Sequence, residues 1–296
     1  MQIEVDPGKY VVAVSGGVDS MVLLDLLTKQ PDLDLVVAHF EHGIREDSDE
    51  DRKLVESAAA TYGLSFVFEH GNLSANASES LARDRRYGFL RQVQEQTSAN
   101  AIITAHHQDD LVETAIINML RGTGRKGLSS LQSTEELVRP LLGTPKQAIL
   151  EYALEHSISW HEDSTNANDA YLRNYIRHTL IPKLGSKGRA ELLAHITKAA
   201  DINPDIDQLL SQDLHLQLND HELKRSWFVM LPYDVSCEMM AAWLRSEGIR
   251  EFDRKLLHKL VVGAKVAMPG KAFDINAGYQ LKVAKTALQV SARVTS

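Results

Sequence analysis

The chain has 296 residues, of which 44% are hydrophobic and 24% are charged, and its formal net charge is −8 at pH 7. This length suits two domains, or one domain with an appendage, and the composition is that of a soluble globular protein. No run is long enough to cross a bilayer, no signal peptide is visible, and the single Cys237 allows no internal disulfide, so we expect a cytoplasmic protein without a membrane partner.

Short apolar runs alternate with helix-like runs through the first 180 residues. Because the apolar runs carry almost no polar positions, the alternation predicts an α/β fold with a parallel sheet covered by helices on both faces. Polar clusters follow the first, second and fourth strands, at the edge where such sheets bind ligands. The predicted strands are 9–14, 34–39, 64–69 and 101–105, and the predicted helices are 19–29, 48–62, 78–96 and 109–120.

A boundary is predicted at 182–189, where proline, two glycines and basic residues follow a helical run. Beyond it, 190–218 and 234–247 are predicted to be helical, and 265–294 to form a few antiparallel strands. We therefore expect three segments. They are a catalytic domain over 1–186, a helical, substrate-binding subdomain over 187–247, and a small α+β region over 248–296.

The stretch SGGVDS at 15–20 joins the first strand to the first helix. It is not a dinucleotide loop, since its two glycines are adjacent, and it is not a Walker loop, since no lysine follows Gly17. It offers bare amides and hydroxyls at a helix N-terminus, which favours an anion. Asp19 would repel a phosphate, so it is better placed to hold Mg²⁺ or to cap the helix. A tight turn built from small residues explains the same pattern without a ligand.

A second polar cluster, HHQDD at 106–110, opens the helix after the fourth strand. Asp109 and Glu113 lie one turn apart, and carboxylates packed at a helix start suit Mg²⁺ or a cationic substrate. Zinc would need a second histidine at helical spacing, which is missing. For any one of these residues, a capped helix with solvated acids stays open as an alternative interpretation.

The segments ESLARDRRYGFL at 79–90 and YLRNYIRHTL at 171–180 each carry several arginines on a helix. From the residues alone, an amphipathic surface helix explains the first of them equally well. Together with SGGVDS and HHQDD, however, they occur in a fixed order. SGGVDS resembles the pyrophosphate loop of the N-type ATP pyrophosphatase (PP-loop) superfamily, whose domain is of the adenine nucleotide alpha hydrolase-like kind. The whole set resembles the tRNA(Ile)-lysidine synthetase family, with matches at Glu79, Ala82, Arg83, Arg86, Tyr87, Asp163, Asn166, Arg173, Asn174, Arg177 and His178.

This resemblance implies an ATP-dependent ligase that uses Mg²⁺, joins free L-lysine to the wobble cytidine of a CAU-anticodon tRNA(Ile), and works through an adenylated base. It implies catalytic roles for Asp109, Asp110, Arg173 and Arg177, and a role in Mg²⁺ binding for Asp19. The implied nucleotide-binding residues are Ser15, Gly16, Gly17, Val18, Asp19, Ser20, Ala38, His39, His106 and Gly122. The implied substrate and tRNA contacts are Glu113, Arg83, Arg86, Arg121 and Asn174.

Two alternatives stay open. A tRNA thiolase on the same scaffold needs two or three cysteines, and this chain has one. A regulator that binds nucleotide without catalysis would keep the loop but not need every acidic and basic position. The oligomeric state is open, with a homodimer as one alternative. Because a net charge of −8 suits RNA poorly, we expect one shared basic groove lined by Arg121, Arg125, Lys126, Arg173, Arg177, Lys183, Lys187 and Arg189.

Overall fold

The computed structural model describes residues 1–41, 48–71, 79–161, 172–250 and 252–293. Its contacts divide the chain into two compact units. The N-terminal unit comprises Met1–Ile117 and Ser129–Leu193, and the C-terminal unit comprises Asn118–Leu128 and Ala194–Ser296. The functional division into three segments stays a prediction.

The N-terminal unit is built on a five-stranded sheet in the order β3-β2-β1-β4-β5. Every pairing in it is parallel, and Val12 of β1 lies between Val37 of β2 and Ile103 of β4. The predicted parallel α/β sheet is therefore confirmed. The strands are β1 (Gly8–Ala13), β2 (Leu33–Glu41), β3 (Ser65–His70), β4 (Ala101–Ile103) and the unpredicted β5 (Leu137–Val138).

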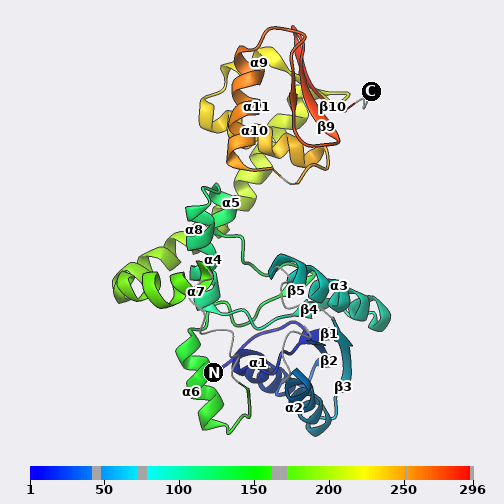
Figure 1. Cartoon of the computed structure of the whole chain (residues 1–296), viewed down its shortest axis with the longest axis vertical. Coiled ribbons are helices and arrows are strands. Elements are labelled where there is room, and N and C mark those ends of the chain that lie inside the picture. The colour runs from blue at the N-terminus through cyan, green and yellow to red at the C-terminus, as the bar shows by residue number, and fades with distance from the viewer. Residues whose placement is uncertain (42–47, 72–78, 162–171, 251, 294–296) are drawn as a thin grey trace. The chain divides into compact units, whose positions relative to one another are not determined.

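Helices cover both faces of this sheet, as predicted (Figure 1). Alternate strand residues point to opposite faces, so Val12 packs with one group of helices and Val11 with the other. On the first side lie α1 (Val18–Thr28), α2 (Ser48–Thr61) and α6 (Lys146–Glu155), and on the second lies α3 (Glu79–Thr97).

The strand order reverses beside β1. The chain runs from β1 outward through β2 to β3, and then returns to place β4 on the other side of β1. In open parallel sheets this reversal opens a crevice at the carboxyl ends of the two central strands. We call this place, at the carboxyl ends of β1 and β4, the switch point. The loops after β1 and β4, which carry SGGVDS and HHQDD, both start there.

Two helical segments carry the predicted catalytic residues, and all of these residues belong to the N-terminal unit. The helix α4 (Gln108–Leu120) starts at the switch point with Asp109 and Asp110 in its first turn. The helix α7 (Leu172–Tyr175) continues into a π-helical turn over Ile176–Leu180, which carries Arg177. Single π-helical turns within helices are frequent at functional sites. The long helix α8 (Ile181–Gln217) follows, and it is kinked at Gly185, where φ is 63°.

The C-terminal unit combines helices with an antiparallel sheet in the order β6-β7-β10-β9-β8. Its core surrounds Trp243 and Phe228, which are completely buried. The predicted antiparallel strands after 265 are confirmed, while β6, β7 and α11 were not predicted. The elements are α5 (Arg125–Leu128), β6 (Leu218–Asn219), β7 (Glu222–Lys224), α9 (Arg225–Met230), α10 (Tyr233–Ser246), α11 (Arg254–Val266), β8 (Ala272–Asp274), β9 (Tyr279–Val283) and β10 (Ala287–Ala292). None of the helices in the described ranges has the length and apolar character that a bilayer span requires.

Candidate active site

The loop after β1 is shaped by its own serines. Ser20 is buried, its hydroxyl donates to the carbonyl of Gly17 (2.9 Å), and it accepts from the amide of Ser15 (3.1 Å). Gly16 has a φ of 93°, and a Cβ there would lie 3.3 Å from the Cβ of Asp51. Both the left-handed backbone and the lack of space require glycine at this position. The hydroxyl of Ser20 therefore holds the loop in shape.

The amides of this loop are available to a ligand. Amides in the first turn of a helix have no partner within it, and no hydrogen bond among the described residues uses those of Gly16, Val18 or Asp19. The amide of Gly17 makes only a long contact of 3.4 Å with the Ser15 hydroxyl. With the positive end of the α1 dipole beside them, these donors fit an anion such as a phosphate.

A lysine from a distant segment reaches the same loop. The ammonium of Lys146, the first residue of α6, lies 2.5 Å from one carboxylate oxygen of Asp19. The other oxygen of Asp19 lies 3.7 Å from Nε2 of His107. Lys146 thus brings to the loop the cation that its own sequence lacks. Sequence reasoning missed it, because α6 and the short β5 that precedes it were not predicted.

Two carboxylates, those of Asp109 and Asp110, lie in the first turn of α4, where the chain leaves β4 at the switch point. Asp109 accepts from the amide of Lys146 (3.3 Å) and contacts the guanidinium of Arg189. Asp110 accepts from the amide of His107 (3.1 Å). Burial alone would raise the pKa of Asp110, but His107 and more distant positive charges hold it below its ordinary value. Asp110 is therefore an anion at neutral pH.

A third carboxylate, Glu113, is completely buried one turn further along α4. It accepts from Nε of Arg173 (3.2 Å), from Nε of Arg177 (2.5 Å) and from Nη2 of Arg177 (2.9 Å). Hydrogen bonding to this carboxylate raises the pKa of Arg177. Arg177 also lies 3.6 Å from Asp110. Glu113 therefore fixes two arginines beside Asp110, an arrangement that favours a positioning role over direct contact with substrate.

Two predicted histidines are uncharged. His39 on β2 is 3% exposed, its Nδ1 bonds to the carbonyl of Val14 (2.8 Å), and burial lowers its pKa. The carbonyl of its neighbour Ala38 accepts from the amide of Val14 (3.0 Å), so both residues hold the base of the loop. Burial lowers the pKa of His106 to about 3, and its Nδ1 lies 2.9 Å from the Thr104 hydroxyl.

Comparison with known proteins identifies the family of this chain and several of its relatives. A family model described as the PP-loop domain matches residues 2–184. The chain belongs to the PP-loop family. It is 36% identical over 283 residues to a tRNA(Ile)-lysidine synthase of Geobacter sulfurreducens, covering 90% of this chain and 58% of that protein. It is 33% identical over 265 residues to a tRNA(Ile)-lysidine synthase of Persephonella marina, covering 86% of this chain and 54% of that protein.

These matches cover only part of each relative, because the chain spans 58% of the first protein and 54% of the second. Among solved structures, this PP-loop chain resembles the U34-tRNA thiolase NcsA of Methanococcus maripaludis with a TM-score of 0.55 and 16% identity. That match covers 67% of this chain and 73% of the thiolase. At this identity the likeness shows a shared fold alone.

Several predicted site residues lie away from the switch point or outside the residues that the structure describes. Arg121 and Gly122 belong to the C-terminal unit by their contacts, and Asn174 is buried beside Arg173 on α7. Asp163 and Asn166 lie outside the described residues. The eight basic residues expected in one groove are divided between the two units, so the groove stays a prediction. Within the C-terminal unit, Arg125 pairs with Asp207 (2.5 Å) and Glu238 (3.1 Å), and Lys126 pairs with Asp207 (2.6 Å).

The fit of Mg²⁺ to the PP-loop site rests on Asp19. No group of three or more His, Cys, Asp or Glu side chains in the described ranges could hold a metal ion. Mg²⁺ is commonly bound by one or two carboxylates together with the phosphates of its nucleotide, so a complete protein cage is not required. Asp19 at the start of α1 has the right donor atoms and lies beside the open amides. The residues present therefore fit Mg²⁺ that arrives with ATP.

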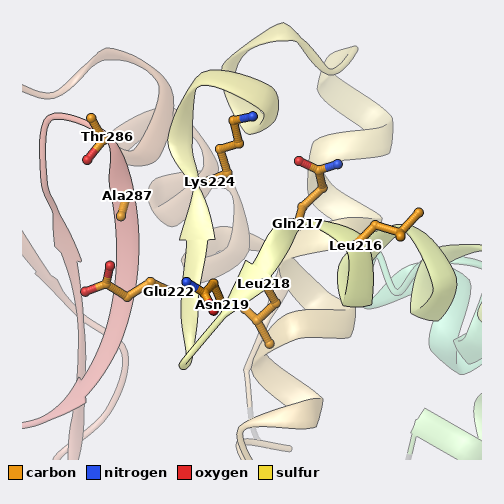
Figure 2. Close-up of a pocket in the computed structure, with 8 residues that line it drawn as sticks. All are labelled: Leu216, Gln217, Leu218, Asn219, Glu222, Lys224, Thr286 and Ala287. Atoms are coloured by element: carbon orange, nitrogen blue, oxygen red, sulfur yellow. The ribbon is translucent and has the colours of Figure 1, made fainter.

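The C-terminal unit contains a hollow of about 420 Å³ beside strands β6, β7 and β10, shown in Figure 2. Its lining mixes apolar side chains such as Leu218 with the oppositely charged Glu222 and Lys224. None of the predicted site residues lines it. The lining residues are Leu216, Gln217, Leu218, Asn219, Glu222, Lys224, Thr286 and Ala287.

Proposed function

We propose that this protein is a tRNA(Ile)-lysidine synthetase. In the proposed reaction, the C2 oxygen of the wobble cytidine of a CAU-anticodon tRNA(Ile) attacks the α phosphate of ATP and releases pyrophosphate. Free L-lysine then attacks C2 through its ε-amine and releases AMP. The observation that carries the proposal is a lysine-free amide loop facing a carboxylate–arginine cluster, in a chain 33–36% identical to proteins of that name over most of its length.

The loop after β1 would hold the β and γ phosphates of ATP. The amides of Gly16, Val18 and Asp19 donate to them, and the ammonium of Lys146 moves from Asp19 to the departing pyrophosphate. Mg²⁺, when bound, neutralises charge on the phosphates, and Asp19 is the residue that would hold it. Asp19 would keep a positive partner in this arrangement, because Mg²⁺ held there would stand in place of the Lys146 ammonium.

The carboxylates at the start of α4 would prepare the lysine nucleophile. An amine attacks only after losing its proton, and an ionised carboxylate can both bind the ammonium and accept that proton. Asp110 is ionised and partly open, and Asp109 lies beside it. Arg173 and Arg177, fixed by Glu113, would stabilise the charge that develops on the α phosphate or the cytidine.

The test is incubation of the full chain with ATP, labelled lysine and a CAU-anticodon tRNA(Ile) transcript. We expect lysine to be incorporated at the wobble cytidine, with one AMP and one pyrophosphate released for each event. A transcript in which the wobble base is uridine is the matched control and should remain unlabelled. Unmodified cytidine under these conditions would refute the proposal.

Thiolation is the weaker alternative, although the chain shares its fold with a tRNA thiolase. Sulfur transfer needs two cysteines, and an iron–sulfur cluster needs three. The only cysteine of the chain, Cys237, lies on α10 in the C-terminal unit. A cytoplasmic location and a homodimer remain predictions from sequence.

A further inference from the structure

Helices α1 and α6 pack side by side in the N-terminal unit, and polar contacts join them at two levels (Figure 1). At the first level, the Lys146 ammonium lies 2.5 Å from Asp19, beside the loop after β1. At the second level, the Tyr152 hydroxyl donates to a carboxylate oxygen of Asp25 (2.7 Å). The partners of each pair are 127 residues apart in the sequence, so the two helices run in the same direction and in matched register.

The buried carboxylate of Asp25 is the centre of the second level. It also accepts from the ammonium of Lys29 (2.8 Å) and from the hydroxyl of Tyr62 (2.9 Å), which follows α2. Burial alone would raise the pKa of Asp25, but hydrogen bonds from Lys29, Tyr152 and Tyr62 lower it below its ordinary value. Asp25 is therefore an anion at neutral pH, which strengthens the hydrogen bond that it accepts from Tyr152.

The hydrogen bond of Tyr152 is a directional contact between α6 and α1. The buried face of α6 is formed by Ile149, Tyr152 and Ala153, and the burial of apolar surface has no preferred direction. A hydrogen bond, in contrast, holds its two atoms within a narrow range of distances. The chain rises about 9 Å along α6 from Lys146 to Tyr152, so a slide of the helix that breaks this bond would also move Lys146 along the loop.

We propose that Tyr152 is a positioning residue for Lys146, and that Asp25 is the anchor to which it binds. The lysine ammonium stands on a flexible stem of four carbons, so its reach depends on where the backbone of α6 is held. With α6 held against α1, the ammonium stays beside the loop, where pyrophosphate would depart. This inference rests on the proposed function, in which Lys146 moves from Asp19 to the pyrophosphate.

The experiment measures the binding of pyrophosphate with Mg²⁺ to the full chain by calorimetry, without tRNA. We expect Lys146→Gln to weaken binding roughly ten- to a hundredfold, because it removes a charged donor. Tyr152→Phe should weaken binding roughly three- to tenfold, since it displaces the ammonium without removing it. In the Lys146→Gln background, Tyr152→Phe should have no further effect, because the group that it positions is gone.

Tyr62→Phe is the matched control. It removes a hydrogen bond to the same carboxylate but from the end of α2, so that α6 keeps its own bond. Loss of either hydroxyl should lower the melting temperature by about 2–4 °C. Only Tyr152→Phe should change the affinity for pyrophosphate, and a role in stability alone would not produce that difference.

The proposal is overturned if Tyr152→Phe or Lys146→Gln keeps the affinity of the wild type, or if Tyr62→Phe weakens binding as much as Tyr152→Phe does. It is also overturned if Tyr152→Phe acts as strongly in the Lys146→Gln background as in the wild type. A wild-type chain that binds no pyrophosphate would overturn it too, although incorporation of lysine into tRNA would still support the proposed function. A wild-type chain that binds pyrophosphate but leaves tRNA unmodified would count against the proposed function alone.

Discussion

The two units of this protein treat polar side chains differently. Among the described residues, ten polar or charged side chains are buried, and only Ser236 of these lies in the C-terminal unit. The N-terminal unit buries Glu113, Arg139 and His107, although burial of charge costs free energy. The C-terminal unit surrounds Trp243 with apolar residues and keeps its ion pairs partly exposed. The buried charges therefore lie in the unit that holds the candidate active site, and the core of the C-terminal unit is almost entirely apolar.

Removing the carboxylate of Glu113 should have the largest effect. Glu113→Ala leaves Arg173 and Arg177 without their buried partner, so we expect a loss of about 3–5 kcal/mol in the free energy of unfolding, and loss of tRNA modification. Urea denaturation and the labelled-lysine assay measure both. In the C-terminal unit, Glu238→Gln breaks a partly exposed pair with Arg125 and should cost about 1 kcal/mol or less. Equal losses in the free energy of unfolding for the two variants would contradict the difference between the two units.

Lys146→Gln should mainly affect the chemistry of the N-terminal unit. Without the ammonium beside the loop, we expect pyrophosphate release from ATP to slow by roughly a hundred- to a thousandfold, with little change in stability. Single-turnover pyrophosphate release in the presence of tRNA is the measurement. Lys9→Gln, which removes a surface pair with Asp34 (3.3 Å), is the control and should behave as wild type. A Lys146→Gln protein as fast as wild type would show that the loop works without this cation.

Acid should destabilise the N-terminal unit through His106. Its folded-state pKa of about 3 lies below the ordinary value near 6.5, so the unfolded chain binds a proton first as the pH falls. The stability associated with neutral His106 is complete above about pH 6.5 and decreases as the pH falls towards about 3. We expect His106→Asn to flatten this slope in thermal unfolding curves. His221→Asn, at an exposed site in the C-terminal unit, should leave the slope unaltered.

The smallest effect should come from the cap of α11. The carboxylate of Asp253 accepts from the amide of Leu256 (2.6 Å), and loss of such a cap costs about 1 kcal/mol. Asp253→Ala should therefore lower the melting temperature slightly and leave the rate of pyrophosphate release unchanged. Asp253→Asn keeps an acceptor and should restore the stability. A defect in the rate would mean that the C-terminal unit contributes to the chemistry.

The sequence predicted what local patterns determine. Apolar runs located β1 to β4 and their helices, and the polar clusters at strand ends located the switch point. It could not predict β5, because two residues are too few to show a pattern, and so it missed Lys146 on the helix that follows. Nor could it predict the burial of Glu113, since its partners lie 60 and 64 residues further along the chain. Contacts of that separation depend on tertiary packing, which no local pattern encodes.

The left-handed backbone of Gly16 has a practical consequence for mutagenesis. If the phosphate contacts come from main-chain amides, an alanine scan through 15–20 would leave nearly every donor atom in place. The defects found by such a scan would come from the strained backbone at Gly16 and from the loss of the Ser20 hydroxyl, while the amide contacts themselves went untested. Only a change that alters the path of the backbone, such as a β-branched residue at Gly16, would reveal how strongly this protein depends on it.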